Sequence, residues 1–173
     1  MTMTVLEREK LRTQLHLLQP KSADFIKADF SNLDDIVAEY DKLYKVGREL
    51  VIIEGRTLAE GLATQATERQ FFGHCTSLLR RIVKIAEARL AASRGKLYQK
   101  LRNEDPRDIS DRALNSIVDG NDEVYEVTME VIKIREYYER FSDLVESYNQ
   151  RGFALNNLTK AMEAAIADME ING

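Results

Sequence analysis

Apolar residues recur at alternating steps of three and four over residues 123–170, and this is the most regular pattern in the chain. Such a repeat is typical of a coiled-coil seam on a long helix. The seam positions are Val124, Val127, Val131, Ile134, Tyr138, Phe141, Val145, Tyr148, Gly152, Leu155, Thr159, Met162, Ile166 and Met169. A continuous helix of this length would span roughly 72 Å at about 1.5 Å per residue. Because Tyr138, Tyr148 and Gly152 suit a two-stranded zipper poorly, we expect the helix to pack inside an antiparallel bundle.

Two further patterns of helical spacing lie upstream of this seam. The first runs over residues 33–51, and Ser31 predicts its start because it begins a sequence that resembles a capping box. The second runs over residues 72–90, and either Gly95 or the polar cluster at 103–106 must end it. Both patterns predict amphipathic helices that bury one face.

A short helix is predicted between these patterns and the long seam. Apolar residues over 114–118 follow Asp108 and Ser110, either of which can cap a helix, and Asp119-Gly120 marks the end. The chain has two prolines, and neither lies within residues 21–105, so a long helix there meets no obligatory break. The pattern as a whole therefore predicts an all-α protein, an elongated antiparallel helical bundle with coiled-coil character that forms oligomers.

The same pattern predicts how the chain is divided. Residues 1–30 carry a short apolar pattern that ends at Pro20, and we interpret them as an N-terminal helix and loop extension. Residues 31–173 are predicted to form the helical bundle domain, with a linker near residues 103–109.

Composition fits one folded domain in a reducing compartment. The chain has 173 residues, of which 44% are apolar and 31% are charged, so it is long enough for a sizeable core and too hydrophobic for a disordered chain. The single cysteine, Cys75, cannot form an internal disulfide. The longest aliphatic run, at residues 50–53, is far short of the ~20 apolar residues of a spanning helix, and the N-terminus is unlike a signal peptide. We expect a soluble cytoplasmic protein without a membrane contact.

The residues needed for catalysis are missing from the pattern. Gly95-Lys96 lacks both the upstream glycine and the following hydroxyl of a phosphate-binding loop. His16 and His74 are the two histidines, and neither follows a glutamate by three residues, as a di-iron helix bundle requires. Cys75 lies on an apolar stripe, where a cysteine usually belongs to the core. We therefore expect no enzymatic activity, no catalytic residue, no metal and no cofactor.

The net charge of −4 conceals a strong asymmetry along the chain. Residues 69–102 carry a net charge of +8, whereas residues 103–150 carry −8. Phosphates attract basic side chains, and aromatic side chains stack on nucleobases. The candidate DNA-binding residues are therefore Arg80, Arg81, Lys84, Arg89, Arg94, Lys96, Tyr98, Lys100 and Arg102. On a helix, Arg80, Lys84, Arg94, Tyr98 and Arg102 share one face. The alternative is that this basic helix packs against the acidic helix at 122–146, and the charges alone leave both interpretations open.

Several segments of the second half of the chain resemble the UvsY family of bacteriophage recombination mediator proteins over about residues 65–165. The segments are Ile85-Ala86-Glu87-Ala88-Arg89-Leu90, Ser93-Arg94-Gly95, Ser110-Asp111-Arg112, the helix from Val124 to Tyr148, and Gln150-Arg151-Gly152-Phe153-Ala154-Leu155. In this resemblance Arg89 matches a basic residue of the DNA-contacting stretch, and Arg94 matches the turn that follows it. The sequence departs from the family at Glu87, where the family has lysine, and at Ala91-Ala92, where it has an aromatic pair.

The resemblance implies an all-helical, ring-forming homo-oligomer that binds single-stranded DNA. It implies as partners a RecA-like recombinase, which the protein helps to load, and the single-strand-binding protein that is displaced. The location would be the cytoplasm of the infected bacterial host. The leading hypothesis is therefore a single-stranded-DNA-binding recombination mediator. The alternative is a helical protein-binding scaffold or phage virion assembly component that does not bind nucleic acid.

Overall fold

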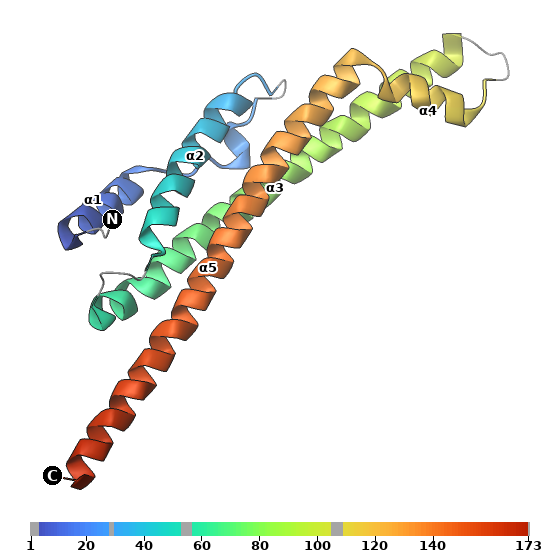
Figure 1. The fold of residues 1–173 in the computed structure, drawn as a ribbon. Coiled ribbons are helices and arrows are strands. Elements are labelled where there is room, and N and C mark those ends of the chain that lie inside the picture. The colour runs from blue at the N-terminus through green and yellow to red at the C-terminus, as the bar shows by residue number, and fades with distance from the viewer. Residues whose placement is uncertain (1–3, 28–29, 53–56, 105–108, 173) are drawn as a thin grey trace. The chain divides into compact units, whose positions relative to one another are not determined.

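The computed structural model describes residues 4–27, 30–52, 57–104 and 109–172, and every regular element in these ranges is helical. The elements are α1 (Val5–Leu17), the short 3-10 helix η1 (Ala23–Phe25), α2 (Leu33–Leu50), α3 (Leu58–Glu104), α4 (Asp111–Asp119) and α5 (Asp122–Asn172). Figure 1 shows them in chain order. The prediction of an all-helical protein is confirmed.

The helix boundaries follow the predicted signals closely in the second half of the chain. Helix α3 continues through Gly95 and ends at Glu104, within the polar cluster at 103–106. The hydroxyl of Ser110 accepts a hydrogen bond from the backbone N–H of Ala113 at 3.3 Å and caps α4, as one of the two predicted caps. The other predicted cap, Asp108, and most of the predicted linker lie outside the described residues.

The start of α2 differs from the prediction. The helix begins at Leu33, so Asn32 and not Ser31 precedes it. The Asn32 side chain is tied back to η1, because its amide donates to the Phe25 carbonyl at 2.7 Å and its oxygen accepts from the Lys27 N–H at 3.0 Å. Phe30 has a φ of 58°, a left-handed conformation that costs of order 1–3 kcal/mol. Its ring is buried, and this burial helps to offset the cost.

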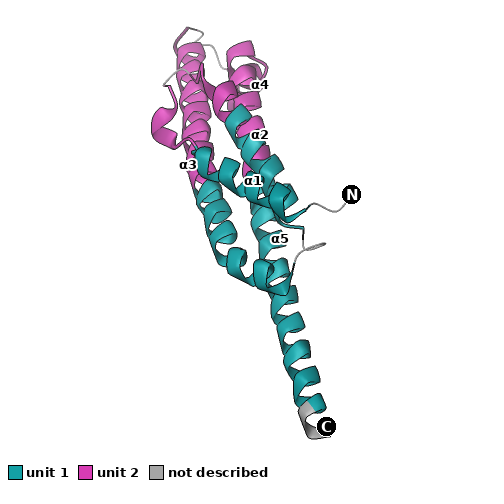
Figure 2. Cartoon of the chain, turned by 90° about the vertical axis from the view of Figure 1, so that its left-hand side faces the viewer, with its two compact units in different colours: residues 1–20, 38–77, 139–173 teal, residues 21–37, 78–138 magenta. Residues whose placement is uncertain are grey.

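The described helices form two compact units, which Figure 2 colours separately. The first unit comprises residues 1–20, 38–77 and 139–173, and the second comprises residues 21–37 and 78–138. The division predicted from the sequence, at residue 30, stays a prediction.

An aromatic cluster forms the centre of the first unit. Tyr40 meets Phe141 edge to face at 5.6 Å between ring centroids, and Phe72 stacks on Tyr148 at 5.3 Å. All four rings are fully buried. Gly47 lies against this cluster, since a Cβ at this position would be 2.5 Å from Leu144 Cδ2 and 2.8 Å from the Phe72 ring. The absence of a side chain at residue 47 therefore permits the close approach of α2 to α3 and α5.

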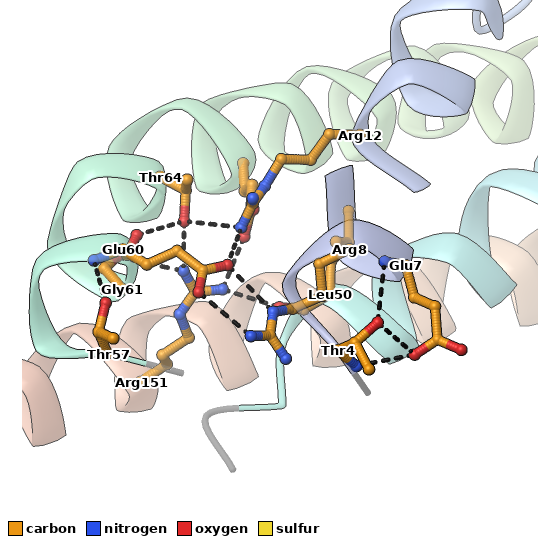
Figure 3. Close-up of polar contacts among 11 residues, drawn as sticks. Thr4, Glu7, Arg8, Arg12, Leu50, Thr57, Glu60, Gly61, Thr64 and Arg151 are labelled. Atoms are coloured by element: carbon orange, nitrogen blue, oxygen red, sulfur yellow. Dashed lines mark hydrogen bonds and ion pairs between the residues drawn. The ribbon is translucent and has the colours of Figure 1, made fainter. Parts of the chain in front are cut away.

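Buried charges attach α1 to the rest of the first unit (Figure 3). Arg8 on α1 forms a 3.0 Å ion pair with Glu60 on α3, and Arg12 pairs with both Glu60 and Glu68. From α5, Arg151 reaches Glu68 at 2.6 Å. The Arg8, Arg151 and Glu68 side chains are 1%, 2% and 4% exposed, so these charges are desolvated and depend on one another.

The second unit has an aliphatic core. Its buried aliphatic side chains are Leu33, Ile36, Val37, Leu78, Leu79, Ile82, Val83, Ala86, Leu114, Val118, Val124, Val127, Val131 and Ile134, and the buried ring of Phe30 belongs to the same unit. The members from α5 are the predicted seam positions, which confirms that this face of α5 is buried. The opposite faces of α3 and α5 in this unit carry the features that bear on function.

Candidate nucleic-acid interface

All nine candidate DNA-binding residues lie on α3 within the second unit. Leu79, Ile82 and Ala86 bury one face of this stretch, so the charged side chains project from its remaining circumference. Six of the nine residues are exposed, namely Arg80, Arg81, Lys84, Lys96, Lys100 and Arg102, and Arg89, Arg94 and Tyr98 are half-buried. The structure divides the nine further by the partners that each one has.

Arg89 is held on the inner side of the unit. Its guanidinium lies 3.3 Å from the Glu130 carboxylate of α5 and 4.6 Å from the centre of the Phe30 ring. A cation over a ring face is attracted by the ring quadrupole, so both contacts hold the guanidinium in place. Two residues before Arg89, Glu87 forms an ion pair with Arg135 of α5. This part of α3 therefore packs against the acidic helix, as one of the two interpretations predicts.

The last three turns of α3 contact α4 and the residues just before it. Arg94 pairs with Asp119 at 2.6 Å, and the Tyr98 hydroxyl donates a 2.7 Å hydrogen bond to Asp111. The Asp111 carboxylate accepts this bond and lies close to the hydroxyl, and it therefore raises the pKa of Tyr98 above its usual value. Arg102 donates to the Ile109 carbonyl at 2.9 Å. These side chains are engaged within the unit, so the predicted single basic face is interrupted here.

Lys100 has a weaker, local contact. Its ammonium lies 3.9 Å from Glu104, one turn further along α3, and both side chains are more than half exposed. An exposed pair of this kind contributes little to stability and is easily exchanged for another anion.

Four of the nine candidates have no ion pair or hydrogen bond from their side chains to any described residue, namely Arg80, Arg81, Lys84 and Lys96. Arg80, Arg81 and Lys84 lie within little more than one helical turn, and Lys84 follows Arg80 by four residues. We name these three residues the basic cluster. Three cations this close together repel one another and gain free energy from a shared anion such as a phosphate backbone.

The residues considered for catalysis form no site in the part of the chain that the structure describes. Cys75 is buried, and burial raises the pKa of its thiol to about 12, so the thiolate is not formed near neutral pH. Across the described ranges no three or more histidine, cysteine or acidic side chains are grouped so that they could hold a metal ion. None of the described helices contains a stretch long and apolar enough to cross a bilayer.

Sequence analysis did not reveal the structural role of Arg151, which belongs to one of the segments that carry the resemblance. Its guanidinium donates to the Leu50 carbonyl at 2.9 Å and to the Thr64 hydroxyl at 3.1 Å besides its pair with Glu68. The partners lie more than 80 residues away in the sequence, so no local spacing could have predicted them. Arg151 is a buried structural residue, whereas the neighbouring Phe153 is exposed.

In comparisons with known proteins, no protein-family model, no curated protein and no solved structure matches the chain. The inference about function therefore rests on the chemistry of the described residues and on the resemblance given above.

Proposed function

We propose that the protein is a non-enzymatic, single-stranded-DNA-binding recombination mediator that helps a RecA-like recombinase to replace a single-strand-binding protein. The observation that carries this proposal is the basic cluster of Arg80, Arg81 and Lys84, which is exposed and has no partner within the described residues. Lys96 adds a fourth available charge on the same helix. The resemblance to the UvsY family supplies the recombinase and the single-strand-binding protein as partners.

Phosphate contacts explain how an acidic protein can bind DNA. Binding releases counterions from the nucleic acid, so its strength depends on the local charge that meets the phosphates and less on the net charge of −4. Two acids near the basic helix already pair with its other residues: Glu130 pairs with Arg89, and Asp119 pairs with Arg94. The basic side chains without a partner are therefore available to bind an external anion.

The end of α5 supports a homo-oligomer, which is the second part of the proposal. Leu158, Met162, Ile166 and Met169 are 50%, 54%, 55% and 75% exposed, although three of them continue the seam that is buried earlier in the helix. A helix that presents such a stripe gains free energy when a second apolar surface covers it. Coiled-coil packing of this stripe between copies, closed into a ring, would repeat the basic cluster along a bound strand.

A charge-reversal experiment tests the DNA-binding part. The variant R80E/R81E/K84E is compared with K10E/K27E/K160E, which changes the net charge equally at three exposed lysines outside the basic cluster. Fluorescence anisotropy with a labelled oligothymidylate at low salt is expected to show at least about tenfold weaker binding for the first variant and a far smaller change for the second. Circular dichroism should show unchanged helicity, because all six side chains are exposed.

The alternative, a helical protein-binding scaffold or virion assembly component, predicts a different result. The wild-type chain would then not bind the oligonucleotide at any salt concentration. Reversal of the basic cluster would instead change the molar mass measured by light scattering.

A further inference from the structure

The second unit contains an apolar groove that the proposed function does not use. It has a volume of about 640 Å³ and lies between the residues around the start of α2 and one face of α5. Phe30 and Leu33 form one wall, and Tyr125, Met129 and Ile132 form the other. The last three side chains are 60%, 46% and 51% exposed.

The apolar residues of α5 in this groove are separate from its buried seam. Tyr125, Met129 and Ile132 follow one another at steps of four and three, so they form their own stripe along two turns of the helix. The seam residues Val124, Val127 and Val131 are buried in the core of the unit. Helix α5 therefore has two apolar stripes here, and the described residues cover only one of them.

The rim of the groove is acidic. Asp34, Glu126, Glu130 and Glu136 line it together with a single cation, Lys133, which pairs with Asp34. Burial raises the pKa of Glu130, and repulsion from Glu126 and Asp34 raises it further, against the opposing effect of Arg89. Lys133 pairs with Asp34 and Arg89 pairs with Glu130, whereas the Glu126 side chain has no ion pair or hydrogen bond within the described residues.

We propose that this groove binds an amphipathic basic helix of a partner protein. A helix that presents large apolar residues at positions i, i+3 or i+4, and i+7 would cover Tyr125, Met129 and Ile132, which is the usual way for a groove to bind a helix. A lysine or arginine residue flanking that stripe would meet Glu126 at the rim, since Glu130 is already paired with Arg89. The exposed ring of Tyr125 would also accept an arginine over its face.

The charges of the groove argue against other occupants. Single-stranded DNA is repelled by the four carboxylates, so the groove is distinct from the proposed DNA interface. The basic cluster of a second copy has the right charge, but Ile85 is the one exposed large apolar side chain beside it among the described residues. The exposed stripe at the end of α5 is apolar, but Glu163 and Asp168 outnumber Lys160 beside it, so it carries the same sign as the rim.

A pair of designed peptides probes this chemistry on the full chain. Both are fluorescein-labelled 15-residue helices with leucine at i, i+3, i+4 and i+7, and the remaining positions are lysine in one peptide and glutamate in the other. Anisotropy at physiological ionic strength is expected to show saturable binding of the lysine peptide and at least about tenfold weaker binding of the glutamate peptide. Equal binding of the two peptides, or binding of neither, would overturn the proposal.

Two variants place the bound peptide in the groove. M129S/I132S removes apolar area from the wall, and E126K reverses one rim charge. We expect about tenfold and about fivefold weaker binding of the lysine peptide, respectively. The matched controls are I117S, at an exposed isoleucine of α4, and E139K, at an exposed glutamate of α5 outside the groove. An equal loss in the controls would mean that the peptide adsorbs to the acidic surface in general, which contradicts the proposal.

Two further readouts separate this proposal from the others. If M129S/I132S lowers the molar mass of the chain in light scattering without any peptide, the groove holds a second copy and the proposal is wrong. Oligonucleotide binding by M129S/I132S should equal that of the wild type. The proposal about the groove can therefore be refuted while the proposal of DNA binding is upheld, and DNA binding can be refuted while the groove proposal is upheld.

Discussion

Replacing Arg151 by methionine is expected to destabilise the first unit strongly. Methionine keeps much of the side-chain length but removes the charge and every hydrogen-bond donor. The change deletes the 2.6 Å ion pair to Glu68 and the hydrogen bonds to the Leu50 carbonyl and the Thr64 hydroxyl. Glu68 keeps its 2.9 Å pair with Arg12, whose side chain is 18% exposed and thus partly hydrated.

The magnitude follows from the burial of both partners. Arg151 and Glu68 are 2% and 4% exposed, and breaking a pair that is this deeply buried typically costs about 3–5 kcal/mol. For a chain of this length each kcal/mol lowers the melting temperature by about 2–4 °C. The expected shift is therefore roughly 6–20 °C.

Thermal unfolding followed by circular dichroism at 222 nm measures this shift, with K160M as the control. Lys160 lies on the same helix and is exposed, so its replacement should change the melting temperature by less than about 2 °C. If Arg151→Met also stays within about 2 °C of the wild type, the buried network does not hold α1, α3 and α5 together, and our reasoning is wrong.

Other predictions concern the packing at glycines and the buried thiol. Gly47→Ala should lower the free energy of unfolding by about 1–3 kcal/mol because its Cβ would lie 2.5 Å from Leu144. Gly95→Ala, whose Cβ would have no atom within 4 Å, should raise it by up to about 1 kcal/mol. Urea unfolding of both variants checks these opposite signs. Cys75 has a folded pKa of about 12 against an ordinary value of 9.0, so the stabilising contribution of its neutral thiol is complete below pH 9 and is lost as pH rises toward 12. The unfolding free energy should accordingly fall with a contribution of about 1.4 kcal/mol per pH unit in that window, and this contribution should vanish in Cys75→Ala; equal slopes for the two proteins would contradict the assignment.

Helix boundaries were predicted well where the signal lies within a few residues of the boundary itself. The end of α3 lies at the polar cluster at 103–106, one of its two predicted positions, and Ser110, one of the two predicted caps, caps α4. The predicted residue before α2, Ser31, was wrong by one position because the Asn32 side chain bonds to the Phe25 carbonyl and the Lys27 N–H, and no helical repeat reveals such a contact.

The candidate site could be predicted only as a set of charges. Composition located the basic helix, but whether a basic side chain is available to bind DNA depends on acidic residues that are far away in the sequence. Arg89 is engaged because Glu130, 41 residues later, lies beside it, whereas Arg80 has no such neighbour in the described residues. The groove at Tyr125, Met129 and Ile132 was missed because its stripe is shorter than the seam that runs beside it.

The salt dependence of binding to single-stranded DNA tests the central claim most directly. If Arg80, Arg81, Lys84 and Lys96 each contact one phosphate, the slope of log affinity against log salt should be about −2.8 per bound protomer on a short oligothymidylate. For R80E/R81E/K84E, which leaves the single contact of Lys96, the slope should become shallower, about −0.7. A wild-type affinity that does not change between about 50 and 200 mM salt, or a variant with the wild-type slope, would contradict the assignment of the basic cluster as the DNA interface.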